Sequence, residues 1–144
     1  MNSEPKPQKT GKTAQILQKT FSILGFLLFS MFSSFQSNDV SQYGTSLWLT
    51  DAWLIGYAVL ALTCLYNAIR PLKPKVFLAL TGITLALAIF RASQIDWSQP
   101  LFCFIAPEEF AKRNPAGNET GGLVIMTLWL VLLWWSNKRA LRST

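Results

Sequence analysis

Four long apolar segments, separated by shorter polar stretches, divide the chain. They cover residues 14–35, 51–69, 76–91 and 121–137. The clearest is Gly121–Trp135, GGLVIMTLWLVLLWW, which contains no charged residue, ends in paired tryptophans and is followed by Lys138, Arg139 and Arg142. An uncharged run that ends in aromatic and then basic residues is typical of a helix that crosses a bilayer and stops at its cytoplasmic face. The pattern therefore predicts an all-α integral membrane protein, a four-helix bundle.

The third segment is the shortest. Its fifteen apolar residues, Val76–Phe90, lie between Lys75 and Arg91. At a rise of 1.5 Å per residue they reach only about 22 Å, against roughly 30 Å of hydrocarbon. We expect the two basic side chains to extend to the interface, or the bilayer to thin around this helix.

The membrane domain is predicted to be a single domain over residues 14–137. Residues 1–13 are polar, basic and contain prolines, which predicts a disordered tail, and residues 138–144 form a basic cytoplasmic tail. The proline and glycine of Asn114–Asn118 predict a break before the fourth helix. The first apolar segment also resembles the core of a signal peptide, but the serines at its end, Ser30, Ser33, Ser34 and Ser37, are never two residues apart, as cleavage requires. We interpret it as a retained helix.

Basic residues are distributed unequally between the two sides that this threading predicts. Ten lie on the side of the two chain ends: Lys6, Lys9, Lys12, Lys19, Arg70, Lys73, Lys75, Lys138, Arg139 and Arg142. Arg91, Lys112 and Arg113 lie on the other side, together with every acidic residue except Glu4. Because cytoplasmic loops are enriched in Lys and Arg, both termini are predicted to be cytoplasmic. We expect the protein in a bacterial inner (plasma) membrane.

Composition and charge exclude several classes of function. Hydrophobic residues make up 51% of the chain and charged residues 14%, which is typical of a membrane protein. The net charge of +6 does not indicate nucleic-acid binding, because the basic residues flank apolar runs instead of following one helix face. The chain has no histidine, which excludes histidine-ligated haem, zinc and copper. Cys64 and Cys103 are predicted in different environments and unpaired. We predict no cofactor and no metal.

Polar residues cluster where the predicted helices meet the outer surface. This outer polar rim comprises Gln36, Asn38, Asp39, Asp51, Arg91 and Glu119. Since all six lie within a turn or two of one interface, they can converge on a shallow pocket in which Arg91 pairs with an acid. The alternative is that each serves its own helix end. Asp51 then acts as a cap or first-turn acid, and Glu119 complements the dipole of the fourth helix.

Tryptophans are expected in two interfacial belts. Trp48, Trp53 and Trp97 belong to the predicted outer belt, with the apolar segment Leu101–Ile105 beside it, and Trp134 and Trp135 to the inner belt.

The centres of the apolar segments contain no Asp, Glu, Lys or Arg. Proton- or ion-coupled transport generally places an ionisable group there, so this absence disfavours a small coupled exporter. Asn67, near the cytoplasmic end of the second helix, is expected to make a local hydrogen bond. Ala79, Gly82 and Ala86, with Gly25 and Gly56, are expected to let the helices of one molecule pack closely.

Three short motifs suggest a family. Glu119–Trp129, ETGGLVIMTLW, matches E-x-x-G-L-V-I-x-T-x-W, Gln36–Asp39 matches the start of Q-x-N-D-P, and Trp53–Tyr57 matches W-x-x-x-Y. In this order and spacing the chain resembles the transmembrane protein 220 family, although Val40 replaces the proline. The resemblance implies a small multi-helix membrane protein without an established activity, four helices, and an outer cluster of Gln36, Asn38, Asp39 and Glu119. It implies no reaction.

The leading hypothesis is a non-enzymatic membrane protein whose outer polar rim binds a lipid headgroup, a small solute or a partner subunit. A membrane-protein partner or a homodimer is compatible with this hypothesis. One alternative is a small transporter or exporter. Another is an enzyme acting on lipid, with Asp39 or Glu119 as general base and Arg91 holding a phosphate.

Overall fold

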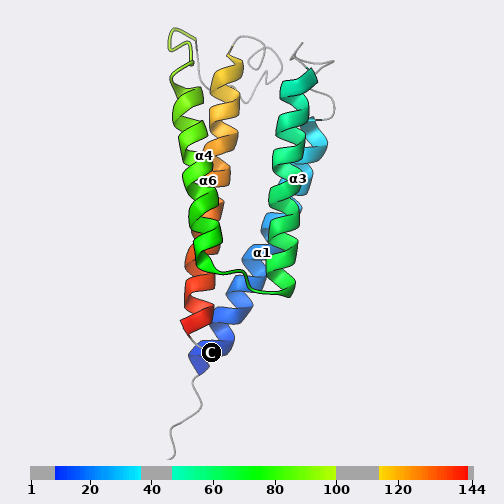
Figure 1. The fold of residues 1–144 in the computed structure, drawn as a ribbon, viewed down its shortest axis with the longest axis vertical. Coiled ribbons are helices and arrows are strands. Elements are labelled where there is room, and N and C mark those ends of the chain that lie inside the picture. Colours follow the sequence, from blue (N-terminus) through cyan, green and yellow to red (C-terminus); the bar gives the residue numbers. More distant parts are fainter. Residues whose placement is uncertain (1–8, 37–46, 100–113, 143–144) are drawn as a thin grey trace, which may run out of the picture.

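The computed structural model describes residues 9–36, 47–99 and 114–142. Within these ranges the regular structure consists of four α-helices and contains no strand (Figure 1). The helices are α1 (Lys9–Gln36), α3 (Leu47–Ile69), α4 (Pro74–Ala92) and α6 (Pro115–Arg142). Each is long and apolar enough to cross a membrane. The all-α prediction with four membrane helices is confirmed, and the protein is an integral multi-pass membrane protein.

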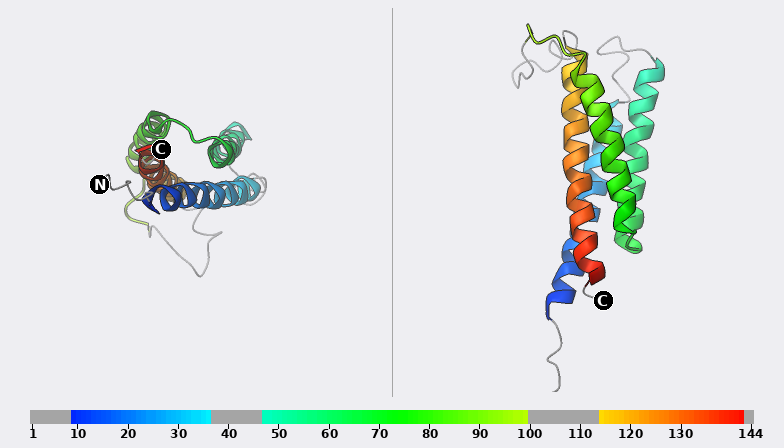
Figure 2. Two further views of the ribbon diagram at one scale, coloured as in Figure 1. Left: turned by 90° about the horizontal axis from the view of Figure 1, so that it is seen from below. Right: turned by 60° about the vertical axis from the view of Figure 1, so that its left-hand side comes forward.

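The helices pack as two pairs, α1 with α3 and α4 with α6. Contact between α1 and α6 joins the pairs, whereas α3 and α4 are connected by a tight hairpin but are not packed closely (Figures 1 and 2). Residues from all four helices form the core between them: Phe29, Tyr57, Leu60, Cys64, Phe77, Leu123, Leu130 and Leu133 are buried there. Large aliphatic side chains such as Leu62, Ile83 and Leu128 are exposed on the outside. A bilayer accommodates that apolar exterior because lipid chains surround it.

Helix α4 is longer than the sequence analysis predicted. It has 19 residues, Pro74–Ala92, and is therefore about 28 Å long. Pro74 is compatible with the helix because the first-turn N–H that proline lacks has no intrahelical partner in any case. The residues beyond the fifteen apolar ones include Lys75 and Arg91, so the uncharged part of the helix is still Val76–Phe90, and the expected extension of the two basic side chains or thinning of the bilayer stays a prediction.

Helix α6 begins at Pro115, where the sequence analysis placed a break. The side-chain oxygen of Asn114 accepts a hydrogen bond from the Gly117 N–H at 3.3 Å, and the backbone oxygen of Asn114 accepts from Gly117 and Asn118. Asparagine before a first-turn proline is a helix start rather than a stop. The helix then continues through Lys138 and Arg139 to Arg142, so most of the predicted basic tail is helical.

The first two helices also begin earlier than predicted. Helix α1 starts at Lys9, so residues 9–13 of the predicted tail are helical, while residues 1–8 lie outside the described part. Helix α3 starts at Leu47, one turn before the predicted start at Asp51. Polar residues such as Lys12 and Thr13 are compatible with a helix, and their polarity was misread as a boundary.

Charges separate toward opposite ends of the bundle. At one end lie the start of α1, the hairpin between α3 and α4, and the end of α6 (Figure 1). This basic end contains Lys12, Lys19, Arg70, Lys73, Lys75, Lys138, Arg139 and Arg142. The opposite, mixed-charge end contains Asp51, Arg91, Asp96 and Glu119. The assignment of the basic end to the cytoplasm stays a prediction.

Candidate functional site at the mixed-charge end

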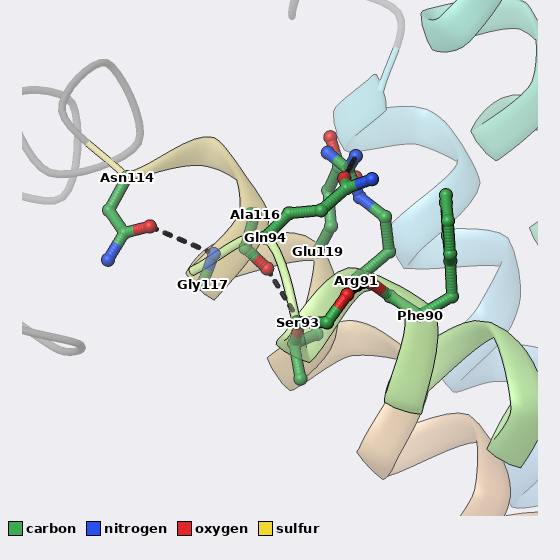
Figure 3. A network of polar contacts seen from close by, with 9 residues as sticks. Phe90, Arg91, Ser93, Gln94, Asn114, Ala116, Gly117 and Glu119 are labelled. Carbon is green, nitrogen blue, oxygen red and sulfur yellow. Dashed lines mark hydrogen bonds and ion pairs between the residues drawn. The ribbon is translucent and has the colours of Figure 1, made fainter. Parts of the chain in front are cut away.

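Arg91 and Glu119 form an ion pair between the last turn of α4 and the second turn of α6 (Figure 3). Arg91 Nε lies 2.5 Å from Glu119 Oε2, and the exposed fractions of the two side chains are 22% and 12%. These two atoms are buried, and the contact lacks the direction of a hydrogen bond, so the attraction is mainly electrostatic. Partial burial strengthens such an attraction because water screens it less.

The Arg91 guanidinium contacts both the turn that follows α4 and helix α6. Nη1 donates to the side-chain oxygen of Gln94, and Nε faces Glu119 Oε2. A guanidinium has five N–H donors in a planar fork, which suits bidentate recognition of a phosphate or carboxylate. Arg91 can therefore bind an anionic group while it stays paired with Glu119.

An aromatic cluster on α1 and α3 is centred on Tyr57. The Tyr57 ring is 5.4 Å from the Phe32 ring, 6.4 Å from Phe29 and 6.0 Å from Trp53. The Tyr57 hydroxyl reaches Gly122 of α6, where a Cβ atom would stand 2.5 Å from the oxygen. Each ring contact is favourable by about 0.5–1.5 kcal/mol beyond its burial. The ring contacts therefore hold α3 against α1, and the contact between the Tyr57 hydroxyl and Gly122 sets the height of α3 against α6.

The contact between Tyr57 and Gly122 also places Trp53 at the level of Glu119 along the bundle. Trp53 precedes Tyr57 by four residues and Glu119 precedes Gly122 by three, so each lies one turn closer to the mixed-charge end than the Tyr57–Gly122 contact. Trp53 Nε1 is buried and has no hydrogen-bond partner in the part of the chain that the structure describes. A buried donor without a partner costs about 1–3 kcal/mol, which makes it a candidate to bind a ligand acceptor.

The other predicted rim residues are less closely associated with this pair. Gln36 is the last residue of α1 and is partly buried, whereas Asp51 is exposed in the second turn of α3. Asp51 is therefore neither a cap nor a first-turn acid, because α3 starts earlier than expected. Glu119 likewise lies within α6 and not before it. Asn38 and Asp39 lie outside the described residues.

The predicted belt tryptophans have different surroundings. Trp97 is 69% exposed beyond the end of α4, whereas Trp53 is half-buried against Tyr57. Trp134 and Trp135 lie near the basic end of α6, each beneath a cation. The side chain of Trp48, and the segment Leu101–Ile105, lie outside what the structure describes.

The loop after α4 contains a carboxylate that is independent of the ion pair. Asp96 accepts hydrogen bonds from the Ser98 hydroxyl at 2.6 Å and the Ser98 N–H at 3.0 Å. These bonds lower the pKa of the exposed Asp96 carboxyl. Asn114 Nδ2 donates to the Asp96 backbone oxygen at 3.2 Å and so connects this loop to the start of α6.

A buried polar cluster at the basic end was missed by the sequence analysis. Its side chains, Gln18, Ser22, Asn67 and Asn137, come from three helices and are at most 1% exposed. Asn67 and Asn137 exchange hydrogen bonds of 2.7 and 3.0 Å, and Gln18 Nε2 donates to the Asn67 backbone oxygen at 2.7 Å. The expectation of a local bond at Asn67 was too narrow. We call these four residues the amide cluster.

The amide cluster also holds the α3–α4 hairpin. Asn67 Oδ1 accepts from the Leu72 N–H, and Asn137 Nδ2 donates to the Leu72 oxygen, both at 2.8 Å. Asn67 Nδ2 donates to Ser22 Oγ at 2.7 Å, so both donors and both lone pairs of the Asn67 amide are used. Because these hydrogen bonds replace those that the amide would make with water, they offset the free-energy cost of burying it.

The small residues divide between buried and outward positions. At Gly25 a Cβ would clash with Trp129 Nε1 and stand 2.9 Å from Cys64 Sγ, so this glycine is needed for packing. A Cβ at Gly82 would meet nothing within 4 Å, and Ala79 and Ala86 are exposed. The small residues of α4, Ala79, Gly82 and Ala86, therefore face outward, and the expectation that they pack against helices of the same molecule was wrong. Cys64 is buried and unpaired, and Cys103 lies outside the described residues.

Helices α4 and α6 are connected instead by hydroxyl groups on their facing sides. Thr127 Oγ1 donates to Thr84 Oγ1 at 2.9 Å, a contact between the middles of the two helices that the sequence analysis did not single out. Helix-to-helix hydroxyl bonds of this kind are a common source of affinity in membranes.

Comparison with known proteins supports the resemblance drawn from the motifs. A family model described as "Transmembrane family 220, helix" matches residues 28–135, which is most of the chain. That range includes Trp53, Tyr57, Arg91, Glu119 and Gly122. Neither a curated protein nor a solved structure gives a match.

Proposed function

We propose that this chain, which belongs to the transmembrane family 220, is a non-enzymatic membrane protein that binds a phospholipid headgroup at its mixed-charge end. The observation on which this rests is the part-buried Arg91–Glu119 pair, together with the unpartnered indole N–H of Trp53 at the same level of the bundle. Gln36, Asn38, Asp39 and Asp51 are retained from the sequence as further contributors. The plasma membrane as location and the outward orientation of this end stay predictions.

The position of the pair favours a lipid over a soluble ligand. Arg91 lies in the last turn of α4, and Glu119 in the second turn of α6, where two membrane-spanning helices approach the interface. Phosphate groups of lipids occur at that depth at high local concentration. A soluble solute or a partner subunit would have to compete with them.

The chemistry of the site favours a headgroup with both charges. The guanidinium of Arg91 and the Trp53 N–H are suited to phosphate oxygens, whereas the Glu119 carboxylate attracts an amine. A zwitterionic headgroup such as phosphoethanolamine contains these two groups a few bonds apart. We therefore propose a phosphate-and-amine headgroup as the ligand.

Three variants test this proposal. The protein, wild type or with Arg91→Gln, Glu119→Gln or Asp96→Asn, is purified in detergent, and retained lipids, solutes and proteins are identified by mass spectrometry. Asp96→Asn is the matched control, because it removes a carboxylate at the same end without affecting the pair. We expect phosphatidylethanolamine to remain with the wild type and with Asp96→Asn. Since charge-assisted hydrogen bonds contribute about 1.5–3 kcal/mol, Arg91→Gln should reduce its retention about tenfold or more.

The reversed pair Arg91→Glu with Glu119→Arg separates folding from binding. This double variant keeps an ion pair, so it should fold, but it moves the cation to α6 and should lose most of the retained lipid. Undiminished lipid on folded Arg91→Gln protein would contradict the proposal, as would recovery of a solute or a protein partner in place of lipid. The transporter alternative stays a prediction, and substrate-dependent flux in proteoliposomes would support it.

A further inference from the structure

The basic end bears a large positive charge. Its eight cations belong to α1, the hairpin and α6, whereas the described carboxylates, Asp51, Asp96 and Glu119, all lie at the opposite end. Lys12, Lys19 and Arg139 are among the cations that are exposed. Such a surface attracts anionic headgroups in the adjacent leaflet.

Two of these cations are held above tryptophan rings. Lys138 Nζ is 4.9 Å from the centre of a Trp134 ring, and the Arg139 guanidinium carbon is 3.9 Å from the centre of a Trp135 ring. In both pairs the cation follows its tryptophan by four residues, so the two contacts lie side by side along α6. The rings place two positive charges at the depth where tryptophans prefer to lie, the boundary between hydrocarbon and headgroups.

The helix turns that bear these cations are fixed by the amide cluster. Asn137 directly precedes Lys138, and Gln18 directly precedes Lys19, and both are buried with their amides bonded to Asn67. The basic side chains therefore project from a rigid base. Binding to a preorganised site loses less conformational entropy than binding to mobile lysines.

Helices α1 and α6 extend past the α3–α4 hairpin at the basic end. Helices α1 and α6 each have 28 residues, about 42 Å, whereas α4 has 19, and Figure 1 shows their basic ends continuing below the hairpin. Next to the exposed Lys12 and Lys19 of α1, the aliphatic side chains of Ile16 and Leu17 are also exposed. Aliphatic and basic side chains side by side are suited to a headgroup boundary rather than to bulk water.

We propose that the basic end contains a specific site for an anionic phospholipid, in which Lys138 and Arg139, held over Trp134 and Trp135, bind the headgroup phosphate. Lys19 and Arg142 supply the surrounding positive field. This site is at the opposite end of the bundle from the proposed zwitterionic headgroup site, and neither proposal depends on the other.

Lipid selection in nanodiscs tests the site. Wild-type protein is reconstituted into phosphatidylcholine mixed with phosphatidylglycerol, extracted, and its retained lipids are counted by native mass spectrometry. The variant Lys138→Gln with Arg139→Gln removes two cations and leaves the rings, while Lys73→Gln with Lys75→Gln removes two cations from the hairpin as the matched control. We expect enrichment of phosphatidylglycerol to fall about fivefold for each charge removed at the tryptophans, equivalent to about 1 kcal/mol per basic residue. The hairpin variant should keep most of the enrichment.

Two further variants keep the result interpretable. Arg139→Gln alone changes an exposed side chain, so it should fold and lose about fivefold. Exchange of the two cations, Lys138→Arg with Arg139→Lys, preserves both cation–ring pairs and should retain the enrichment. Equal losses from the tryptophan and hairpin variants would show diffuse attraction and overturn the proposal. No enrichment by the wild type would overturn it as well.

Discussion

Two glycines allow aromatic side chains to reach a neighbouring helix. Gly25 on α1 makes room for the Trp129 indole and the Cys64 sulfur, and Gly122 on α6 makes room for the Tyr57 hydroxyl. Gly56 and Gly82 differ, because a Cβ at either position would meet nothing within 4 Å. The same residue type is therefore required at two positions of the bundle and dispensable for packing at two others.

Gly25→Ala should destabilise the protein by about 1–3 kcal/mol, since an added methyl group in a filled core forces its neighbours to move. Unfolding in mixed micelles, followed by tryptophan fluorescence, measures the change. Gly56→Ala is the control: it adds the same methyl group to open space and should be neutral or stabilising by about 0.5–1 kcal/mol, because alanine favours the helix. Equal destabilisation by both substitutions would contradict the packing role of Gly25.

Gly122→Ala should also destabilise, but Tyr57→Phe should partly rescue it. The Tyr57 hydroxyl oxygen lies 2.5 Å from the position that a Cβ of residue 122 would take, and the next atom of that ring is 3.8 Å away, an ordinary contact. Removing the hydroxyl group therefore removes the clash. The double variant should be more stable than Gly122→Ala alone by about 1 kcal/mol or more, in the range of typical overpacking costs. Strictly additive effects of the two substitutions in a double-mutant cycle would refute direct contact.

The sequence indicated these residue-scale features only in part. It predicted that glycines permit close approach, but a one-dimensional pattern does not say which helix face is covered, so Gly25 and Gly82 looked alike. The prediction that Arg91 pairs with an acid agrees with the structure, which identifies Glu119 as the partner. The partner could not be chosen from sequence, because Asp39, Asp51 and Glu119 all lay near one predicted interface.

At the scale of helices and hairpins, the amide cluster compensates for the sparse packing between α3 and α4. The hairpin places these helices next to each other in sequence, yet α3 packs on α1 and α4 packs on α6. Asn67 accepts a hydrogen bond from the Leu72 N–H and Asn137 donates one to the Leu72 oxygen, and these two bonds anchor the hairpin to the bundle. The turn is thus held by polar contacts where apolar contacts between its two helices are few.

The Asn67–Asn137 pair should show coupling in a double-mutant cycle. Either asparagine changed to alanine leaves buried partners unsatisfied, and we expect about 1–3 kcal/mol of destabilisation from each. The double variant should cost less than the sum by about 0.6 kcal/mol or more, the average for polar pairs between membrane helices being about 0.6 and the largest about 1.7 kcal/mol. Thermal unfolding in detergent gives the three free energies. Asn118→Ala, an exposed position on α6, is the control and should change little. Additive losses would mean that the two amides act independently.

Helix existence was predictable, whereas helix ends were not. Each apolar segment predicted one helix, because twenty or so apolar residues have few alternatives in a bilayer. The ends were misread where polar residues continue a helix: Lys9–Thr13, Pro115–Thr120 and Lys138–Arg142 are all helical. Asn114 and Pro115 in particular were treated as a break, although the same two residues in that order cap a helix. The amide cluster was missed for a related reason, since its four members are adjacent only once those ends are placed.

At the scale of the whole molecule, charge and length both distinguish the two ends of the bundle. The basic end has α1 and α6 projecting past the hairpin, and the mixed-charge end has the Arg91–Glu119 pair and the Tyr57 cluster between its helices. Four membrane crossings, as predicted from the sequence, place the basic residues near the start of α1, between α3 and α4 and at the end of α6 on one side. In the structure these residues do lie at one end of the bundle. The compartment that each end faces is predicted only from the unequal distribution of basic residues.

That asymmetry predicts one orientation, with both chain ends cytoplasmic. In a variant with Cys64→Ala and Cys103→Ser, a cysteine is introduced either at the exposed Ser98 of the mixed-charge end or after Thr144. We expect a membrane-impermeant maleimide to label Ser98→Cys in intact cells, and the C-terminal cysteine only after lysis, because the sequence predicts ten basic residues on the side of the chain ends against three on the other. Removal of Arg91 should not alter the pattern, whereas replacing Arg70, Lys73 and Lys75 together should weaken it, since short basic loops determine orientation. Labelling of the C-terminal cysteine from outside would invert the molecule and assign the Arg91–Glu119 site to the cytoplasmic leaflet.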